Sequence, residues 1–271
     1  MRTLLPAIFV IGCADGNTQE DPSEWYDPGS AYDVLEPIAF TDVNYGFTGE
    51  TAIADLPVPE PFETWFAPGD APPSDDCADW LTDSGLPATI SGIVTILPRF
   101  YYKSSGCTPN SGDNDEKFYG SFFVQDSTGG YFVLGDTKVA HFDAGDRVTL
   151  KVRAVREAFE QFMIPVYDTV EIVRGPEPIY YEAVPTGPLG PEHVSRVVRI
   201  EGTVATEPTT FGEIYVDADD GTRHKFGLDS ELNRRGVAFP IGSRLQVTGP
   251  VLFSFDEYTI IVMRIGQLTE L

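Results

Sequence analysis

Residues 90–94 read Ile-Ser-Gly-Ile-Val, and residues 200–204 read Ile-Glu-Gly-Thr-Val. Both stretches alternate apolar residues with small or polar ones, which is the pattern of a half-buried strand. Both also have a glycine in the middle, which suits a first strand that must bend. The two stretches therefore predict equivalent first strands of two related β modules.

The rest of each module repeats in the same order. A hairpin turn at 126–129 corresponds to one at 217–221, and a strand that opens Gly-Asp-Arg at 145–147 corresponds to Gly-Ser-Arg at 242–244. Residues 147–155 (RVTLKVRAV) alternate strictly, which predicts that Val148, Leu150, Val152 and Ala154 point inward.

The connector before the fourth strand of the second copy, residues 229–236, predicts one or two helical turns. Five strands with a connector between the third and fourth is the order of the OB-fold, a small Greek-key barrel. We therefore expect an all-β chain with two five-stranded OB-like barrels at 87–175 and 193–271, joined by a Pro-rich linker at 176–192. A pair of β-sandwich modules is the alternative fold.

The sequence Phe123-Val124-Gln125-Asp126, followed by a glycine, strengthens this assignment. It resembles the phrase before the third strand in tandem OB-fold modules of exported bacterial proteins. The resemblance covers about residues 88–174 and 194–271, although the second copy carries Tyr215-Val216-Asp217 instead. It implies a binding module, because OB-folds bind oligonucleotides or oligosaccharides on the face of strands two and three.

The N-terminus reads as an export signal. An uncharged run at 4–12 follows Arg2 and is too short to cross a bilayer. Residues 10–13 (Val-Ile-Gly-Cys) resemble the bacterial lipobox, which implies removal of residues 1–12 and multiple acylation of Cys13. The membrane would then be a partner through this lipid, and Ala14 favours the outer over the inner membrane. The alternative is that residues 1–12 form a buried strand with an ordinary cysteine.

The net charge of -24 is concentrated near the N-terminus. Residues 14–98 contain 17 acidic residues and no Lys or Arg, together with many prolines and glycines. Such a composition buries little apolar surface and repels itself, so we expect residues 13–86 to form an extended, largely irregular stalk. Aromatic residues between 32 and 66 indicate that parts of this segment pack on something.

Two cysteines remain after Cys13. In an exported chain, Cys77 and Cys107 favour a disulfide that would join the stalk to the first module, with a loop-closure stabilisation of about 3 kcal/mol. Two free or intermolecular thiols are the alternative.

The charge disfavours nucleic acid as a partner. Residues 88–174 hold 9 basic and 11 acidic residues, and residues 193–271 hold 8 and 11, so neither module has the positive excess that phosphate binding rewards. One aromatic and basic cluster is a candidate ligand patch, and its members are Arg99, Phe100, Tyr101, Tyr102 and Lys103.

Catalytic and metal motifs are scarce. The three histidines have no companions at zinc spacing, and no Gly-x-Ser-x-Gly elbow or phosphate loop occurs. Asp113, Asp115 and Glu116 form a candidate calcium site, because carboxylate oxygens are the preferred ligands of Ca²⁺. No other cofactor is predicted. A second acidic run at 217–220 is better explained by tight-turn chemistry.

The leading hypothesis is a membrane-anchored, non-catalytic lipoprotein of the cell envelope that binds a protein or an envelope glycan. One alternative is an enzyme accessory or weak hydrolase with a site between the modules, and another is an OB-fold binder of single-stranded nucleic acid. A concave pocket with two close carboxylates would favour the enzyme, whereas an exposed aromatic face would favour binding.

Overall fold

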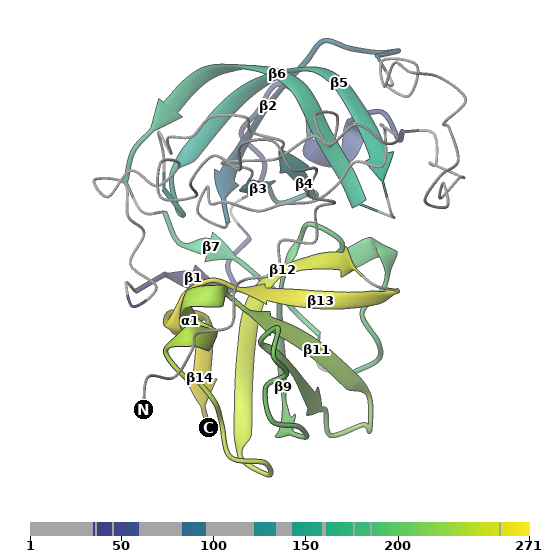
Figure 1. The fold of residues 1–271 in the computed structure, drawn as a ribbon. Coiled ribbons are helices and arrows are strands. Elements are labelled where there is room, and N and C mark those ends of the chain that lie inside the picture. Colours follow the sequence, from purple (N-terminus) through teal and green to yellow (C-terminus); the bar gives the residue numbers. More distant parts are fainter. Residues whose placement is uncertain are drawn as a thin grey trace, which may run out of the picture.

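In the computed structural model, ten stretches of the chain are described, and the structural statements below concern these residues. They are residue 35 and residues 37–44, 46–59, 83–95, 122–133, 143–158, 161–175, 177–184, 186–254 and 256–271. Over these stretches the chain is nearly all β, as predicted, and forms two barrels that lie one above the other in Figure 1.

The first barrel closes from five strands, which are β2 (Ala88–Val94), β3 (Phe122–Gln125), β4 (Gly130–Val133), β5 (Arg147–Ala158) and β6 (Gln161–Val173). Their order around the barrel is β2-β3-β4-β6-β5. Neighbouring strands are antiparallel except β4 and β6, which are parallel. β6 is one long strand with register shifts along β5, which lets it bend around the barrel.

The second barrel repeats this circuit with β9 (Val197–Val204), β10 (Glu213–Asp217), β11 (Arg223–Leu228), β12 (Arg244–Ser254) and β13 (Glu257–Val262). The order is β9-β10-β11-β13-β12, and pairing of β12 with β9 closes it. Here too the third and fifth strands are the parallel pair. The predicted OB-like order is thus confirmed, and the β-sandwich alternative is wrong because each set of strands closes on itself.

Short elements complete the second barrel. The predicted helical connector is α1 (Ser230–Arg234), after which Gly236 adopts a φ of 74°. The chain then ends with η5 (Ile265–Gln267) and β14 (Leu268–Glu270), and β14 adds to the edge of β12.

The mid-strand glycines are required by a close approach of the second strand. A Cβ on Gly92 would lie 2.8 Å from the carbonyl oxygen of Gln125, and a Cβ on Gly202 would lie 2.8 Å from that of Asp217. Any side chain at these positions would push the first two strands of the barrel apart. The glycine pattern therefore reports the same backbone contact in both modules.

The start of the fourth strand is also identical in the two modules. The N–H of Gly145 donates to the carbonyl of Val94 (2.8 Å), and the N–H of Gly242 donates to the carbonyl of Val204 (2.9 Å). Both glycines have a φ near 90°, a conformation that other residues rarely adopt. The predicted repeat therefore holds at the level of single hydrogen bonds.

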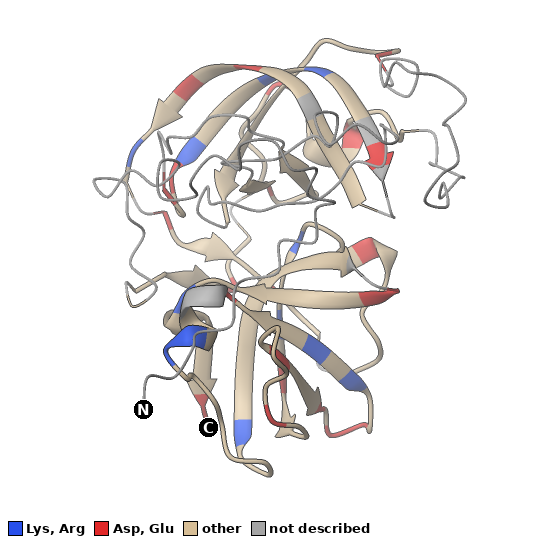
Figure 2. Ribbon diagram, in the orientation of Figure 1, with Lys and Arg blue, Asp and Glu red and all other residues tan. Residues whose placement is uncertain are grey.

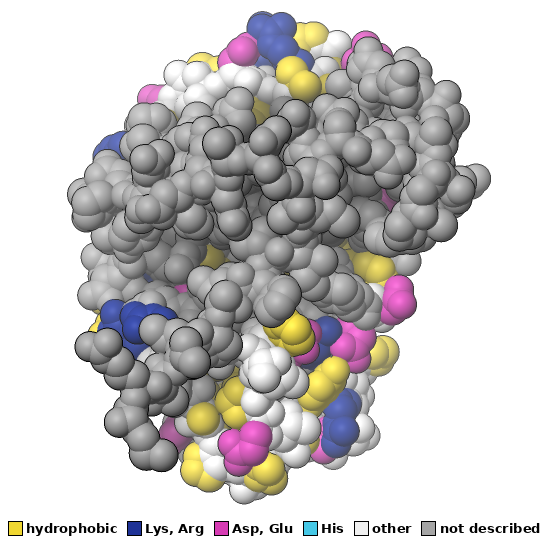
Figure 3. All heavy atoms as spheres, in the orientation of Figure 1, with side chains coloured by type: hydrophobic (Ala, Val, Ile, Leu, Met, Phe, Trp, Pro, Cys, Tyr) yellow, Lys and Arg dark blue, Asp and Glu magenta, His cyan; other side chains and the backbone are white. Residues whose placement is uncertain are grey.

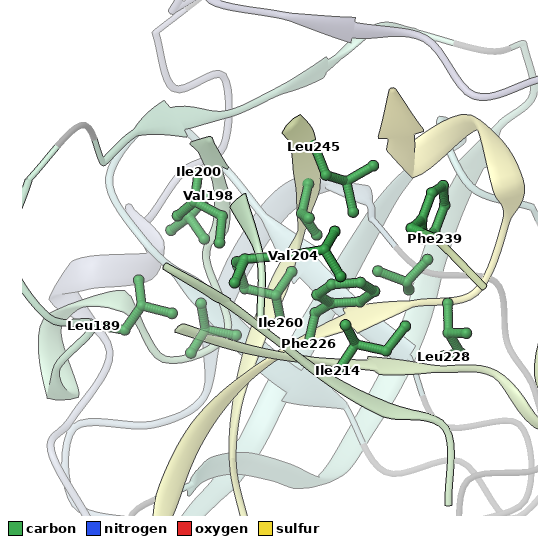
Figure 4. Close-up of a cluster of buried hydrophobic side chains, with 14 of the residues drawn as sticks. Leu189, Val198, Ile200, Val204, Ile214, Phe226, Leu228, Phe239, Leu245 and Ile260 are labelled. Atoms are coloured by element: carbon green, nitrogen blue, oxygen red, sulfur yellow. The ribbon is translucent and has the colours of Figure 1, made fainter. Parts of the chain in front are cut away.

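Each barrel encloses its own apolar core. Phe226 lies at the centre of the second core, among side chains that include Ile214, Val204 and Ile260 (Figure 4). Full burial of one such side chain contributes about 1.5–3 kcal/mol. In the first barrel the four residues predicted to point inward are all buried, namely Val148, Leu150, Val152 and Ala154.

A segment before each barrel buries apolar side chains in the core of that barrel, and we call these segments straps. The first strap comprises residues 37–44 and 46–59, with β1 (Phe40–Thr41) and η2 (Ile53–Asp55). The second strap comprises residues 177–184 and 186–193. It contains β7 (Ile179–Tyr180), β8 (Glu182–Ala183) and η4 (Pro191–His193). β1 pairs in parallel with β7, so the two straps meet between the barrels (Figure 1).

The straps bind the hairpin turns in the same way. The N–H of Ile53 donates to the carboxylate of Asp126 (2.9 Å), and the N–H of Gly187 donates to that of Asp220 (2.7 Å). Leu56 and Leu189 are each buried in the core of the barrel that follows. The repeated unit therefore includes a strap as well as five strands.

The first strap changes the interpretation of the acidic segment. It is largely irregular, as predicted, but residues 37–59 do not form an extended stalk, because Ala52, Ile53 and Leu56 are buried and the Asp126 turn holds their backbone. Packing between residues 32 and 66 is thus confirmed, although aliphatic residues carry most of it. No helix in the described part of the chain is long and apolar enough to cross a membrane.

Candidate binding face of the second barrel

The outer surface of β10, β11 and β13 is the face of strands two, three and five, and we call it the second-barrel face. Strand register sets its side chains in three rows. The upper row contains Asp217, Arg223 and Glu257, the middle row Tyr215, Lys225 and Thr259, and the lower row Glu213, Gly227 and Ile261. Figure 2 shows the two basic residues as blue bands on β11 and Glu257 in red at the start of β13.

Alternation along the strands places these side chains outside. Ile214, Val216 and Phe226 point into the core, so their neighbours in sequence must point away from it. Figure 3 shows acidic, basic and apolar side chains close together on this part of the second barrel. Phe211, in the β9–β10 loop beside the face, is 64% exposed.

Lys225 is the centre of the face. Only 4% of its side chain is exposed, and its Nζ donates to Glu257 Oε2 at 2.7 Å and lies 3.4 Å from Glu213 Oε1. Burial lowers the pKa of Lys225, but the hydrogen bond to Glu257 and the charge of Glu213 outweigh burial and leave the pKa raised. One buried ammonium is thus shared by two carboxylates that remain 31% and 45% exposed.

Tyr215 and Glu257 extend this network. The Tyr215 hydroxyl donates to Glu257 Oε2 at 2.9 Å. Burial and the neighbouring carboxylate raise the pKa of Tyr215, while the hydrogen bond from Lys225 lowers the pKa of Glu257. The face therefore holds an ordered carboxylate and phenol around a fixed positive charge.

Two further groups complete the rows. Arg223 donates through Nε and Nη2 to the carboxylate of Asp217 at 2.7 and 2.9 Å, and this pair stays largely exposed. The hydroxyl of Thr259 is buried beside Lys225 and has no hydrogen-bond partner among the described residues. Such a group is destabilising by about 1–3 kcal/mol until it finds a partner.

The corresponding face of the first barrel is closed. Its middle row is equivalent by register to Tyr215-Lys225-Thr259 and consists of Phe123, Phe132 and Met163. Each of these three residues is at most 2% exposed. The rings of Phe123 and Phe132 are 4.9 Å apart. An apolar row has thus replaced the charged network of the second barrel.

The upper row of the first barrel binds the second strap and the start of the second barrel. Gln125 donates from Nε2 to the Tyr180 carbonyl (2.9 Å) and accepts at Oε1 from the Val197 N–H (2.6 Å). Gln161 donates to the Ser195 hydroxyl at 2.5 Å. Gln125, the glutamine of the recognised sequence phrase, therefore joins the two barrels.

A hollow of about 390 Å³ lies between the modules. Its three carboxylates are each engaged. Arg264 donates to the carboxylate of Asp143, and Arg147 donates to that of Glu177. The carboxylate of Asp146 accepts the backbone N–H groups of Asp143 and Gly175. The hollow is concave, as the enzyme alternative requires, but these carboxylates already serve structural contacts. That alternative stays a hypothesis.

The candidate residues singled out from sequence lie elsewhere. Cys13, Cys77, Cys107, the cluster Arg99–Lys103 and the calcium candidates Asp113, Asp115 and Glu116 all fall outside the described residues, so these assignments stay predictions. Among the described residues, no group of three or more His, Cys, Asp or Glu side chains is placed to hold a metal ion.

The acidic run at 217–220 is explained by structure, as expected. Arg223 binds Asp217, Arg244 binds Asp219, and Asp220 accepts the N–H groups of Gly187 and Thr222. These hydrogen bonds lower the pKa of each of the three carboxyls. The run therefore orders the hairpin turn.

No protein-family model matches the sequence, and no curated protein sequence matches it. Among solved structures, the S. pombe Stn1–Ten1 complex is 20% identical over 28% of this chain and 57% of that chain, with a TM-score of 0.24. The Ifi202 HINa domain in complex with 20-bp double-stranded DNA is 11% identical over 68% of this chain and 95% of that chain (TM-score 0.31). A murine DNA-binding protein bound to double-stranded DNA is 7% identical over 68% and 97% (TM-score 0.30). Likenesses at these TM-scores do not indicate a ligand or an activity.

Proposed function

We propose that this chain is a non-catalytic binding protein of the cell envelope and that the second-barrel face is its ligand site. One observation carries the proposal. The same face is present in both barrels, but in the first it is buried against the chain itself, whereas in the second it presents Tyr215, Arg223 and Glu257, and Phe211 is exposed just before β10. Exposed aromatic and charged groups held on a rigid barrel are typical of binding sites.

The proposal includes an anchor at the N-terminus. The lipobox-like sequence supports lipidation of Cys13, and Ala14 supports placement in the outer membrane. Replacing Cys13 with serine should move the protein from the membrane fraction to the soluble fraction. A mass spectrum without an acylated Cys13 in the membrane fraction would remove this part of the proposal and leave the binding face unaffected.

The chain offers a closely matched pair of variants for testing the face. Arg223 pairs with Asp217 on the second-barrel face, and Arg153 pairs with Asp168 on the outside of the first barrel. The two arginines are 56% and 50% exposed, so Arg223→Ala and Arg153→Ala remove equivalent surface ion pairs.

The experiment is a capture of ligands from envelope extract by the full-length protein in detergent, with glycan and single-stranded DNA arrays in parallel. We expect Arg223→Ala to change capture at least about tenfold, or about 1.4 kcal/mol, with a gain for a cationic ligand because Asp217 loses its partner, and Arg153→Ala to leave capture unchanged. Equal capture by the two variants would exclude the face as the site. Salt-sensitive DNA binding that is lost in Arg223→Ala would favour the nucleic-acid alternative instead.

A further inference from the structure

We infer that the second-barrel face binds an extended, positively charged polypeptide segment. This inference rests on the proposed function and names the chemical class of its ligand. Two independent observations support this inference. The first is that the first barrel binds polypeptide through the equivalent rows, and the second is the negative charge of the second-barrel face.

The first barrel shows what this face of the module can hold. Its upper row binds polypeptide, because Gln125 contacts the Tyr180 carbonyl and the Val197 N–H, and Gln161 contacts the Ser195 side chain. The bound segment there runs from the end of β7 to the start of β9, and two of its contacts are made through its backbone. Because the two barrels share this strand arrangement, the upper row of the second barrel has the geometry to hold a polypeptide segment as the upper row of the first does.

The charge of the second-barrel face selects the type of segment. The charge is counted over the face, the β9–β10 loop and the turn between β12 and β13. These segments carry two basic residues and five acidic ones, a balance of 2 − 5 = −3. The basic residues are Arg223 and Lys225, and the acidic ones are Glu207, Glu213, Asp217, Asp256 and Glu257. Arg223 is neutralised by Asp217, and Lys225 serves two carboxylates at once. The surplus is therefore negative, which repels phosphate and attracts lysine or arginine.

The remaining groups fit such a ligand. Glu213 and Glu257 are partly exposed and approach Lys225 through one oxygen each, so each can accept a second cation. The exposed Phe211 ring offers an apolar and cation-binding surface at the edge of the face. Gly227 leaves the lower row without a side chain next to the Thr259 methyl, and the buried Thr259 hydroxyl has no hydrogen-bond partner among the described residues.

The test uses the full chain and a fluorescent oligolysine of about eight residues, which spans up to about 27 Å when extended. Binding is followed by anisotropy at about 0.15 M salt, where charges farther apart than about 8 Å are largely screened. Oligoglutamate and single-stranded DNA of similar length are the comparison probes. We expect binding of oligolysine alone.

Matched double variants separate the face from the overall negative charge. Glu207→Gln with Asp256→Asn removes two exposed charges at the rim and leaves Lys225 paired, and Asn tolerates the φ of 60° at position 256. The control, Asp75→Asn with Asp76→Asn, removes two charges from the acidic N-terminal segment. We expect at least about tenfold weaker binding for the first pair and less than about twofold for the second.

A third variant, Glu213→Gln with Glu257→Gln, removes both partners of Lys225 and should abolish binding, provided that its thermal unfolding shows a folded protein. Amide shifts of Gly227 and Thr259 in NMR spectra locate the peptide independently of any variant. Equal weakening by the rim and control pairs, or no oligolysine binding, overturns the inference. If envelope ligands are still captured through Arg223 in that case, the proposed function stands and only its ligand class is wrong.

Discussion

The two barrels share one backbone plan and differ on the outer face of their second, third and fifth strands. In the first barrel this face has an apolar middle row, Phe123-Phe132-Met163, and an upper row that binds the rest of the chain. In the second it has a buried lysine among carboxylates and an exposed upper row. The comparison teaches that the same face of a repeated module can serve the assembly of the chain in one copy and stay exposed in the other.

The largest effect is expected at Gly130, where the first barrel meets the chain between the second strap and β9. A Cβ there would lie 2.1 Å from the Ser195 carbonyl oxygen, so Gly130→Val forces backbone apart and should reduce the free energy of unfolding by about 3 kcal/mol. Urea unfolding measures it. Arg223→Val, at the equivalent position of the free face, should change stability by no more than about 0.5 kcal/mol. Similar losses in both variants would contradict the assignment of one closed and one free face.

The next prediction tests where the barrels are alike. Gly92→Ala and Gly202→Ala each place a Cβ 2.8 Å from a carbonyl oxygen of the neighbouring strand, so both should lower the free energy of unfolding by about 2 kcal/mol. Gly227→Ala is the control, because its Cβ meets only the Thr259 methyl at 3.5 Å. A large difference between the first two variants would show that the modules are less equivalent than their hydrogen bonds indicate.

The third prediction concerns a pair of equivalent buried side chains, Tyr131 and His224. The Tyr131 hydroxyl donates to the Pro57 carbonyl of the first strap at 3.3 Å. His224 is 3% exposed, and its Nε2 has no hydrogen-bond partner among the described residues. Burial lowers the pKa of His224 below its ordinary value of 6.5. The charge of Asp220 raises the pKa of His224, and that of His193 lowers it.

A lowered histidine pKa means that the unfolded chain binds a proton more readily than the folded one. Stability should therefore fall as the pH drops below about 6.5, by up to about 1.4 kcal/mol per pH unit from this group. We expect His224→Phe to reduce the dependence of the free energy of unfolding on pH between pH 7 and 5, the range in which an ordinary histidine titrates. Urea unfolding at several pH values measures it. An unchanged slope in His224→Phe would assign the acid sensitivity to other groups.

The smallest effect on stability is expected at Lys225, the counterpart of Phe132. Lys225→Met keeps an unbranched side chain in the middle row and leaves two carboxylates that water can reach, so the free energy of unfolding should change by less than about 1 kcal/mol. The pKa of Glu257 should rise, because Lys225 is the main cause of its lowering. Carboxyl NMR titration measures that shift, and a Glu257 pKa that does not move would show that the ion pair is absent in solution.

The repeated architecture could be predicted because its signals are local. The repeated glycines at 92 and 202 and the alternation in 147–155 can both be seen in the sequence. The inward face of 147–155 is confirmed, whereas the close backbone approach at the glycines is visible only in the structure. The straps were missed as part of the repeat. They are short and rich in proline, and they bind mainly through backbone N–H groups to Asp126 and Asp220, which leave no periodic pattern.

The OB-fold resemblance implies a binding face on strands two and three, but which of the two copies stays open could not be predicted. Tyr215 and Lys225 occupy ordinary outward positions of alternating strands, and only the arrangement of the two barrels reveals that one face is closed and the other free. The glutamine of the Phe-Val-Gln-Asp phrase was recognised as a fold signal, but its bonds to Tyr180 and Val197 depend on residues 55 and 72 positions away. Contacts at such separations are set by the whole fold.

The parallel pairing of β1 with β7 gives the molecule a defined path for mechanical force. The N–H groups of Ile179 and Tyr181 donate to the carbonyls of Ala39 and Thr41 at 2.8 and 3.0 Å, so a pull on the chain before β1 passes directly to the segment that enters the second barrel. The first barrel lies in the loop between these strands and is bypassed by the load. Of the contacts of the first barrel, those of Gln125 with Tyr180 and Val197 lie on the loaded segment, so a pull would strain the closed face before the strands of that barrel.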